Sequence, residues 1–442
     1  MTTDAGASRP TRTDAAPGAI APAPREGGPR VGLALAGGVV EGGFYEVGVL
    51  CALEESVAGL DLGALDTYVG VSSGALIASL LANGVTPRTL SRAVVGRAGP
   101  TLDLSPELLF DVAWRDHALR LLQVPALAAD IARRVLARPL DESPYGVLME
   151  LGAALPPGLF AGQAIERYLE RALGEGGRSN DFRRLGRRLR VVAVDLDTSA
   201  VVDFGGADTA HVPISRAVRA SIALPGLYQP VEIDGRHYID GVARRTMHAS
   251  VALKEGVDLL LCVNPIVPVE LRGEGAAEAR GPLVRHGLPA VLSQTFRTLV
   301  HSRLSTAFEH YAHAYPSTDV VLIEPDMKDH RLFFSNIFSF SNRRGVTEHA
   351  YQSTRRWLRA GATALGPVLA RHGLALRDDV LADETRTLYP ERRVEQRAER
   401  TAGAARPAFQ APTVEATGLG AVLGRLDAVL DRVAAAVAVG AR

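Results

Sequence analysis

The chain has 442 residues, of which 47% are hydrophobic and 22% are charged, a composition typical of a globular protein with a sizeable core. Its 49 basic and 49 acidic residues cancel, so there is no overall positive field to recruit nucleic acid, and we expect no nucleic-acid partner. The two cysteines, Cys51 and Cys262, lie far apart in apolar runs, which argues against a disulfide framework and favours a reducing compartment.

The first residues predict no folded element. Residues 1–29 are rich in Ala, Pro, Gly, Thr and Arg and lack an apolar run of the length found in signal peptides, so we expect a disordered leader. No window of the chain approaches 18 consecutive apolar residues, which disfavours a membrane-spanning helix. We therefore expect a cytoplasmic protein whose membrane contact, where it occurs, is peripheral.

Two strand, turn and helix units come next. The first has a buried strand at residues 30–35, a glycine-rich turn at residues 37–43 and a helix at residues 44–57. The same succession returns over residues 67–81, around a Gly-x-Ser-x-Gly sequence. Adjacent units of this kind predict a mostly parallel sheet covered by helices.

The middle of the chain predicts a helical insert and more strands. Residues of about 105–155 are strongly apolar with helical spacing, which fits either an insert packed on the sheet or a lid whose apolar face meets lipid. Further helices are expected at residues 162–173, 214–224 and 288–314, and further strands at residues 188–195, 200–204, 257–263 and 319–323. Residues 231–240 predict a hairpin that turns at Asp234-Gly235.

The core domain is expected to end near residue 364. Residues 377–406 are highly charged, and residues 407–416 have the composition of a linker. A helical apolar stripe then follows, formed by Val422, Leu426, Val429, Leu430, Val433 and Val437. This stripe favours docking on the body or self-association over a membrane-surface helix, because the charges beside it balance.

Gly70-Val71-Ser72-Ser73-Gly74 is the strongest chemical signal. It stands between an apolar strand and a small-residue helix, which is where a nucleophile elbow places its serine. Glycines on both sides leave room for a tight turn, and the following helix brings N–H donors and a partial positive end. The pattern predicts that Ser72 attacks an acyl carbon.

Two placements of the base are open. An α/β-hydrolase would use a late histidine, and the candidates are His301, His310, His313, His330, His349 and His372. None of them directly follows an apolar strand in a short loop. Asp240 stands at a strand end before Gly241, behind two apolar residues that imply partial burial. A carboxylate held there can accept the serine proton, so we favour a Ser72–Asp240 dyad without histidine.

In combination these motifs resemble the patatin-like phospholipase family. The resemblance covers about residues 31–265, and four segments carry it in the family's order: residues 32–50, the Ser72 pentapeptide, Ala220-Ser221-Ile222-Ala223-Leu224-Pro225-Gly226 and Ile239-Asp240-Gly241. It implies an α/β protein with a three-layer α/β/α patatin-like fold and a mostly parallel central sheet, to which the chain adds a helical insert and a C-terminal helical extension. The domains are then residues 1–29, a catalytic domain at 30–364, and residues 365–442.

The resemblance also implies an activity. We expect a serine lipid acyl hydrolase that cleaves fatty-acyl esters of phospholipids or related lipids, with Ser72 as nucleophile and Asp240 as general base. Its partner is the lipid substrate, and the reaction requires no metal or organic cofactor. Phe333, Phe334, Phe338 and Phe340 fit either core packing or the lining of an acyl-chain pocket.

The oxyanion hole implied by the resemblance is the glycine-rich turn, and here the chain departs from the family. The family typically has Gly-Gly-Gly-x-Arg/Lys-Gly, whereas residues 37–43 read Gly-Gly-Val-Val-Glu-Gly-Gly and contain no Arg or Lys. Donation by backbone N–H needs no side chain, so the expected donors are Gly37, Gly38, Val39 and Ser73. The missing cation motivates an alternative, a catalytically weak or inactive patatin-fold protein that binds lipid or a partner. Val242, where the family usually has Gly or Ala, is expected to crowd the turn.

Overall fold

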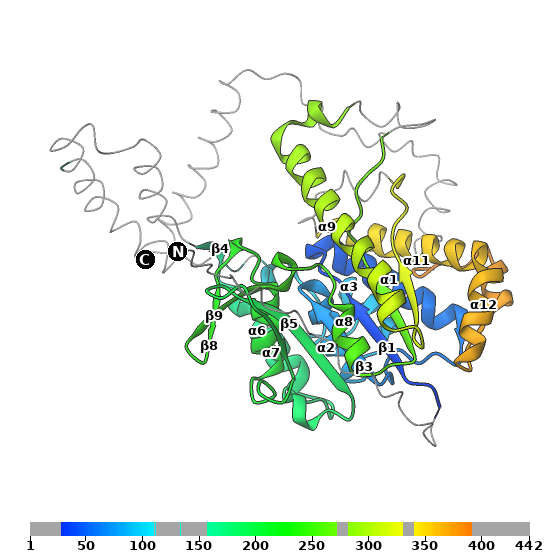
Figure 1. The fold of residues 1–442 in the computed structure, drawn as a ribbon, viewed down its shortest axis with the longest axis horizontal. Helices are drawn as coiled ribbons and strands as arrows, with labels where there is room; N and C mark the ends of the chain where they lie inside the picture. The colour runs from blue at the N-terminus through cyan, green and yellow to red at the C-terminus, as the bar shows by residue number, and fades with distance from the viewer. Residues whose placement is uncertain are drawn as a thin grey trace, which may run out of the picture. The chain divides into compact units, whose positions relative to one another are not determined.

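The structure, a computed structural model, describes residues 28–109, 111, 133, 157–271, 282–329 and 340–390. The chain divides into two units, residues 1–388 and 389–442, and every element below belongs to the first (Figure 1). The expected leader, nearly all of the helical insert, three of the four clustered phenylalanines and the C-terminal stripe lie outside the described residues.

A mostly parallel sheet forms the centre of the unit. Its strand order is β11-β10-β1-β3-β5-β9-β8, with β6 also paired to β5. The bounds are β1 Val31–Leu35, β3 Thr67–Val71, β5 Arg188–Asp195, β6 Val201–Phe204, β8 Val231–Ile233, β9 Arg236–Asp240, β10 Leu259–Val263 and β11 Asp319–Ile323. The five strands from β11 to β5 pair in parallel, and β6, β8 and β9 pair antiparallel. Every residue of β1, β3 and β10 is buried, as continuous apolar runs in parallel strands require.

Helices cover both faces of this sheet. One face carries α1 Val39–Ser56, α2 Ser73–Ala82, α3 Pro87–Val94, α6 Gln163–Gly174, α7 Ile214–Ile222 and α11 Arg343–Ala360, and the other carries α8 Ala249–Lys254 and α9 Gly287–Ala314. Along β1, Leu33 and Leu35 enter the first core and Ala34 enters the second, as the alternation of side chains along a strand dictates. The expected three-layer α/β/α architecture is confirmed.

Short elements complete the unit. These are β2 Val57–Ala58, β4 Gly158–Phe160, β7 Gly226–Tyr228, β12 Ala375–Leu376, α12 Ala362–Arg371, α13 Asp378–Ala382 and the 3-10 turns η1 Pro106–Leu108, η2 Phe182–Arg184, η3 Gly241–Ala243 and η4 Leu283–His286. Within the described ranges, no helix is both long and apolar enough to cross a membrane.

The local sequence correctly predicted the hairpin turn but not the start of the first helix. The turn between β8 and β9 has positive φ at Asp234 and Gly235, 51° and 73°, which is the expected two-residue hairpin turn. The glycine-rich turn, in contrast, is shorter than expected. Helix α1 begins at Val39, so residues 39–43 form its first turn instead of a loop before it.

The unit also continues past residue 364, where the sequence placed the end of the domain. Strand β12 pairs antiparallel with β2, and the N–H of Arg377 donates to the carbonyl of Ser56 at 2.8 Å. Leu369 and Leu381 are buried in the same core as α1. These long-range contacts tie residues 365–388 to the sheet domain, and charge composition alone does not reveal them.

Candidate active site

Ser72 lies in a strained turn between β3 and α2. Its backbone has φ 54° and ψ −124°, a conformation that costs a non-glycine residue free energy and persists only where neighbours enforce it. Both neighbouring glycines are required by close approach. A Cβ on Gly70 would lie 2.5 Å from Cα of Ala75, and one on Gly74 would lie 2.6 Å from the carbonyl oxygen of Leu35. The strand therefore turns into the helix tightly enough to leave Ser72 at the N-terminus of α2.

Ser221 of α7 holds the backbone of this turn. The N–H of Ser72 donates to Oγ of Ser221 at 2.9 Å, and the Ser221 hydroxyl donates to the carbonyl of Val192 in β5 at 2.6 Å. From the sequence, Ser221 was only part of a motif and had no predicted role. A serine on the buried face of an amphipathic helix was the available signal, because buried hydroxyls need a partner.

Asp240 ends β9, which β5 separates from β3 in the sheet, and its carboxyl faces Ser72. The carboxyl is buried, accepts a hydrogen bond from the N–H of Val242 at 2.9 Å, and is hydrogen-bonded to the Ser72 side chain. Burial raises the pKa of Asp240 to about 7, against the lowering effect of these two hydrogen bonds. The structure thus brings together the two residues that lie far apart in the sequence.

The turn after Asp240 packs directly on the glycine-rich segment. A Cβ on Gly241 would lie 2.7 Å from the carbonyl oxygen of Val192, and one on Gly37 would lie 2.3 Å from Cγ2 of Val242. The expected crowding by Val242 is absorbed because Gly37 has no side chain. Nearby, Nε2 of buried His248 lies 3.4 Å from the Gly241 carbonyl oxygen, and burial lowers the pKa of His248 to about 4. This histidine was not among the predicted site residues.

The backbone N–H groups of the four expected oxyanion donors differ in their hydrogen-bond partners. The N–H of Gly37 donates to the carbonyl of Thr246 at 2.9 Å, which removes Gly37 from the expected set. The N–H of Gly38 donates to Oγ of Ser73 at 3.0 Å. The N–H groups of Val39 and Ser73 belong to the first turns of α1 and α2, where a helix supplies no acceptor of its own. Val39 has φ 57°, a rare conformation for a β-branched residue.

A cation lies close to the glycine-rich segment although the segment contains none. Glu41 is buried in the first turn of α1, where a carboxylate is favoured by the helix dipole. Arg297 of α9 donates from Nη1 to the carbonyl of Val267 at 3.2 Å. Burial lowers the pKa of Arg297, and the negative charge of Glu41 opposes that effect. The guanidinium comes from a helix more than two hundred positions later, so no local motif reveals it.

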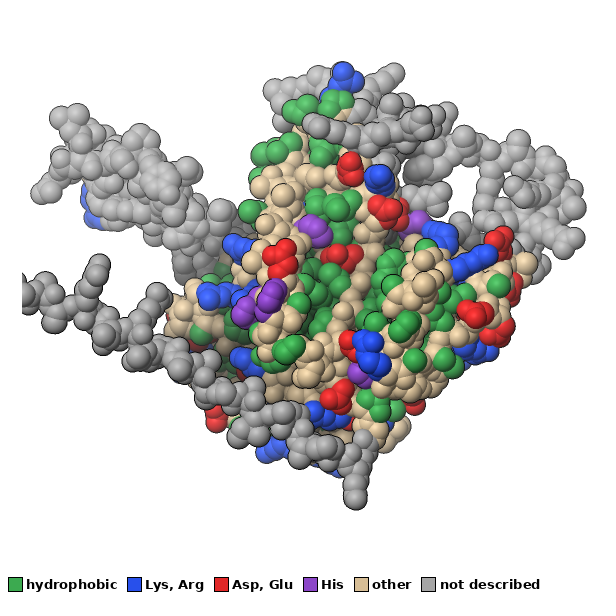
Figure 2. Space-filling view, turned by 45° about the vertical axis from the view of Figure 1, so that its right-hand side comes forward, with side chains coloured by type: hydrophobic (Ala, Val, Ile, Leu, Met, Phe, Trp, Pro, Cys, Tyr) green, Lys and Arg blue, Asp and Glu red, His purple; other side chains and the backbone are tan. Residues whose placement is uncertain are grey.

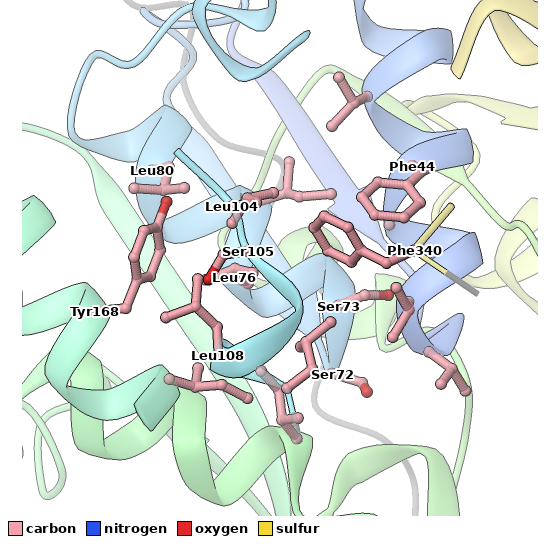
Figure 3. A pocket seen from close by; sticks show the side chains of 18 of the residues that line it. Phe44, Ser72, Ser73, Leu76, Leu80, Leu104, Ser105, Leu108, Tyr168 and Phe340 are labelled. Carbon is pink, nitrogen blue, oxygen red and sulfur yellow. The ribbon is translucent and has the colours of Figure 1, made fainter. Parts of the chain in front are cut away.

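An apolar cavity opens from Ser72 (Figure 3). In this view Ser72 and Ser73 lie at the lower right, Phe44 and Phe340 lie together above them, and Leu80 and Tyr168 lie at the left. Among the described residues that line the cavity, none is charged, and the lining is almost entirely aliphatic and aromatic. The shape and chemistry fit a hydrocarbon chain whose end lies at the serine.

Of the four clustered phenylalanines, which fitted either core packing or the lining of a pocket, the structure describes Phe340. Its ring contacts that of Phe44 edge-on at 5.2 Å between centroids, and both rings line the cavity. Phe340 therefore serves in core packing and in the cavity wall at once. Phe333, Phe334 and Phe338 lie outside the described residues.

The late histidines lie elsewhere. His372 pairs with Asp319 at 2.7 Å, His349 pairs with Asp329, and His313 bonds the backbone of Glu309 on α9. No histidine is found among the described residues that line the cavity at Ser72, and His330 is not described. Nor do the described residues bring together three His, Cys, Asp or Glu side chains that could hold a metal ion.

Comparison with known proteins adds a family and several distant structures. The family model described as patatin-like phospholipase matches residues 33–253, which is half of the 442-residue chain. VipD from Legionella pneumophila is 16% identical, with a TM-score of 0.34 and coverage of 76% of this chain and 67% of its own. The complex of full-length ExoU with full-length SpcU from the type III secretion system of Pseudomonas aeruginosa gives 16% identity, a TM-score of 0.26 and coverage of 63% and 53%. This chain spans about half the length of the latter match.

Proposed function

Because this chain belongs to the patatin-like phospholipase family, we propose that it is a serine lipid acyl hydrolase that cleaves fatty-acyl esters of phospholipids or related lipids. The observation that carries the proposal is the strained Ser72, hydrogen-bonded to a buried carboxyl at the end of an apolar cavity. A strained serine beside a carboxyl with a raised pKa, at the end of a cavity, is the combination expected of a reactive serine.

The chemistry follows from the two side chains. Oγ of Ser72 attacks the ester carbonyl carbon while Asp240 takes the hydroxyl proton, and the bond to the leaving alcohol then breaks as Asp240 returns that proton to the alcohol oxygen. A water molecule next attacks the acyl-serine, with Asp240 again accepting a proton, and the fatty acid leaves as Ser72 is regenerated. A base whose pKa lies near 7 is suited to both the acceptance and the return.

The oxyanion is held by backbone groups in this proposal. The N–H groups of Val39 and Ser73 stand at the N-termini of two helices that flank Ser72, so they add the positive ends of both dipoles. The N–H of Gly38 joins them when Oγ of Ser73 gives way to the substrate oxygen. Donation by these groups requires no Arg or Lys in the loop.

The cavity supplies the preference for a fatty chain. Each methylene buried in its apolar lining stabilises the bound substrate by about 0.8 kcal/mol, so a longer chain is bound more tightly until the cavity is filled. A charged head group gains nothing from this lining. We therefore place the acyl chain in the cavity and the head group outside it.

Two substitutions test the assignment. Ser72→Ala and Asp240→Asn are each expected to lower the release of free fatty acid from mixed phospholipid vesicles by at least about a thousandfold, because each removes a group that reacts. Labelling by a fluorophosphonate probe should disappear with Ser72→Ala. Ser79→Ala, on the buried face of the same helix, is the matched control and should keep full activity.

One alternative rests on a specific observation. The N–H of Gly38 is occupied by Ser73 and the loop has no cation, which fits a catalytically weak or inactive lipid-binding member of the fold. Absence of both fatty-acid release and fluorophosphonate labelling in the wild-type chain would establish that alternative. Full activity retained by Ser72→Ala would reject the serine mechanism outright.

A further inference from the structure

A row of large apolar side chains is exposed on η4 and the first half of α9. Val284, Leu288, Leu292, Phe296 and Leu299 are 73, 69, 58, 44 and 56% exposed. Within α9 they recur every three or four residues, so they share one face of the helix. Figure 2 shows hydrophobic side chains on the projecting part of the molecule, where Figure 1 places α9. We call these five residues the α9 row.

The side of α9 opposite the α9 row packs against the rest of the folded unit. The row therefore faces away from that unit. The Gln294 side chain bonds both the N–H and the carbonyl of Val269, at 3.1 and 2.8 Å. Arg297 bonds the carbonyl of Val267, and Val300 and Leu304 are buried. Rotation of the helix to hide the row would break these contacts.

Within the segment that carries the row, the charged side chains have one sign. Between residues 282 and 308 the sequence contains Arg285, Arg297 and Arg303 and no Asp or Glu. Arg285 and Arg303 are both exposed, at the two ends of the row, and Arg303 follows Leu299 by one helical turn. An apolar helix face flanked by arginines is the pattern of a helix that lies in the interface of an anionic bilayer.

The row also lies at the sheet edge that holds Ser72. Residues 267–269, which α9 contacts, follow the carboxyl end of β10, and Ser72 follows the carboxyl end of β3. Parallel strands place these ends at a common edge. A lipid surface that meets the row would therefore lie on the side from which Ser72 is approached.

We propose that the α9 row docks this protein on the surface of an anionic lipid bilayer. A second copy of the chain fits the row less well, because two-fold pairing of antiparallel rows would place Arg285 of one copy beside Arg303 of the other, and residues 282–308 of neither copy contain an acidic residue to offset them. Apolar burial anchors the helix at shallow depth, and the two arginines contact lipid phosphates. The docking is independent of the chemistry at Ser72.

Vesicle binding by the full chain tests the proposal. The Ser72→Ala background prevents hydrolysis, and the probe is vesicles of phosphatidylcholine with about 30% phosphatidylglycerol, compared with phosphatidylcholine alone, in a flotation assay. Binding is expected to be stronger to the anionic vesicles. Phe296→Ser with Leu299→Ser should weaken it by on the order of tenfold or more, because two buried apolar side chains are lost.

Two further variants separate this result from misfolding. Leu159→Ser removes an exposed apolar side chain from β4, which pairs with β7, and should bind like the parent chain. Arg285→Gln with Arg303→Gln keeps the apolar row and should weaken binding to anionic vesicles by roughly tenfold, with little effect on neutral ones. Thermal unfolding of each variant establishes that it is folded.

The contrary outcomes are distinct. Failure of the parent chain to bind anionic vesicles would overturn the proposal, and so would equal binding by the Phe296→Ser, Leu299→Ser variant. A dimer in sedimentation velocity that dissociates in that variant would assign the row to a second copy instead. None of these outcomes bears on fatty-acid release by the wild-type serine, which is measured on detergent-dispersed substrate.

Discussion

Two non-glycine residues with positive φ, Ser72 at 54° and Val39 at 57°, line the same cavity. Each such conformation costs about 1–3 kcal/mol, so the surrounding packing must enforce both. Glycines at 37, 70 and 74 permit the close approach that does so. Both strained residues lie where the Ser72 hydroxyl meets the N-termini of α1 and α2. Packing that holds the hydroxyl and the N–H donors in place before substrate binds favours the proposed reaction.

Ionisation of the buried Asp240 carboxyl, which the proposed base role requires, lowers the stability of the folded chain. Its pKa is raised to about 7 in the folded chain from about 3.9 in the unfolded chain, so the folded state binds the proton more tightly. The stability that the protonated form contributes is fully present below about pH 4 and is lost as the pH rises through 7. A shift of this size corresponds to at most about 4 kcal/mol.

We predict that Asp240→Asn is inactive but more stable than the wild type at pH 8, and that the difference shrinks towards pH 4. The wild-type kcat/KM should rise with pH with a midpoint near 7, because the base must be ionised. Chemical denaturation at several pH values and a pH–rate profile measure the two effects.

Asp195 offers a control of opposite sign. The N–H of Thr198 bonds its carboxyl at 3.0 Å and helps to lower its pKa, so its contribution to stability is present near neutral pH and is lost in acid. Asp195→Asn should therefore be less stable than the wild type at pH 7. Equal pH dependence for Asp240→Asn and the wild type would show that Asp240 does not titrate as stated.

Ser221 gives a prediction about positioning. Ser221→Ala leaves the N–H of Ser72 and the carbonyl of Val192 without their shared partner, so the strained turn should relax. We expect kcat to fall by about tenfold or more with a smaller change in KM, and stability to fall by about 1–3 kcal/mol. Steady-state kinetics and urea unfolding provide the measurements.

The matched control lies on the same helix. Ser215 is equally buried and accepts a hydrogen bond from Asn180 at 2.9 Å, away from Ser72. Ser215→Ala should lose similar stability and keep its kcat. If both variants lost kcat in proportion to their stability, Ser221 would have only a structural role.

At the scale of elements, the start of α1 differs most from its sequence. Val39 to Gly43 contains two β-branched residues and two glycines, all poor in a helix interior, so local propensity places a loop there. Tertiary packing overrides it. Pro265 fills the space beside Gly38 and Gly42, and the Arg297 guanidinium lies near Glu41. The helix begins early because its glycines fit against another loop.

The strands were more predictable than this helix. Strands β5 and β11 match the predicted ranges, and β1, β6 and β10 differ from theirs only at the first residues. The signal is clearest in β1 and β10, because buried strands in parallel sheets are continuous apolar runs bounded by polar or turn residues. The hairpin turn at Asp234 was also predicted correctly. Local sequence controls these features, whereas a helix start depends on what packs against it.

For the whole molecule, residues 365–388 belong to the folded unit. Arg355 is buried and donates to the carbonyls of Val380 and Asp383, the latter at 2.7 Å. Removing the segment would leave a buried guanidinium with lost partners and would uncover the edge of β2. Stability of the sheet domain therefore depends on a segment whose own composition suggests a tail.

Two truncations test this dependence. A chain ending after residue 390 should unfold within a few degrees of the full chain, whereas one ending after residue 364 should be destabilised by about 3–5 kcal/mol or fail to remain folded. Thermal unfolding followed by circular dichroism compares them. Similar midpoints for the two truncated chains would return the domain boundary to residue 364.

The sequence by itself determined the sheet and the strand, turn and helix at Ser72, and it predicted Asp240 as the base, because apolar runs, glycine spacing and a strand end are all local patterns. Only the tertiary structure decided which partners meet there. Ser221 and Arg297 reach the site from distant helices, and Gly37 is withdrawn from it by Thr246. Such contacts depend on how elements pack across the sheet, and no pattern within one segment encodes them.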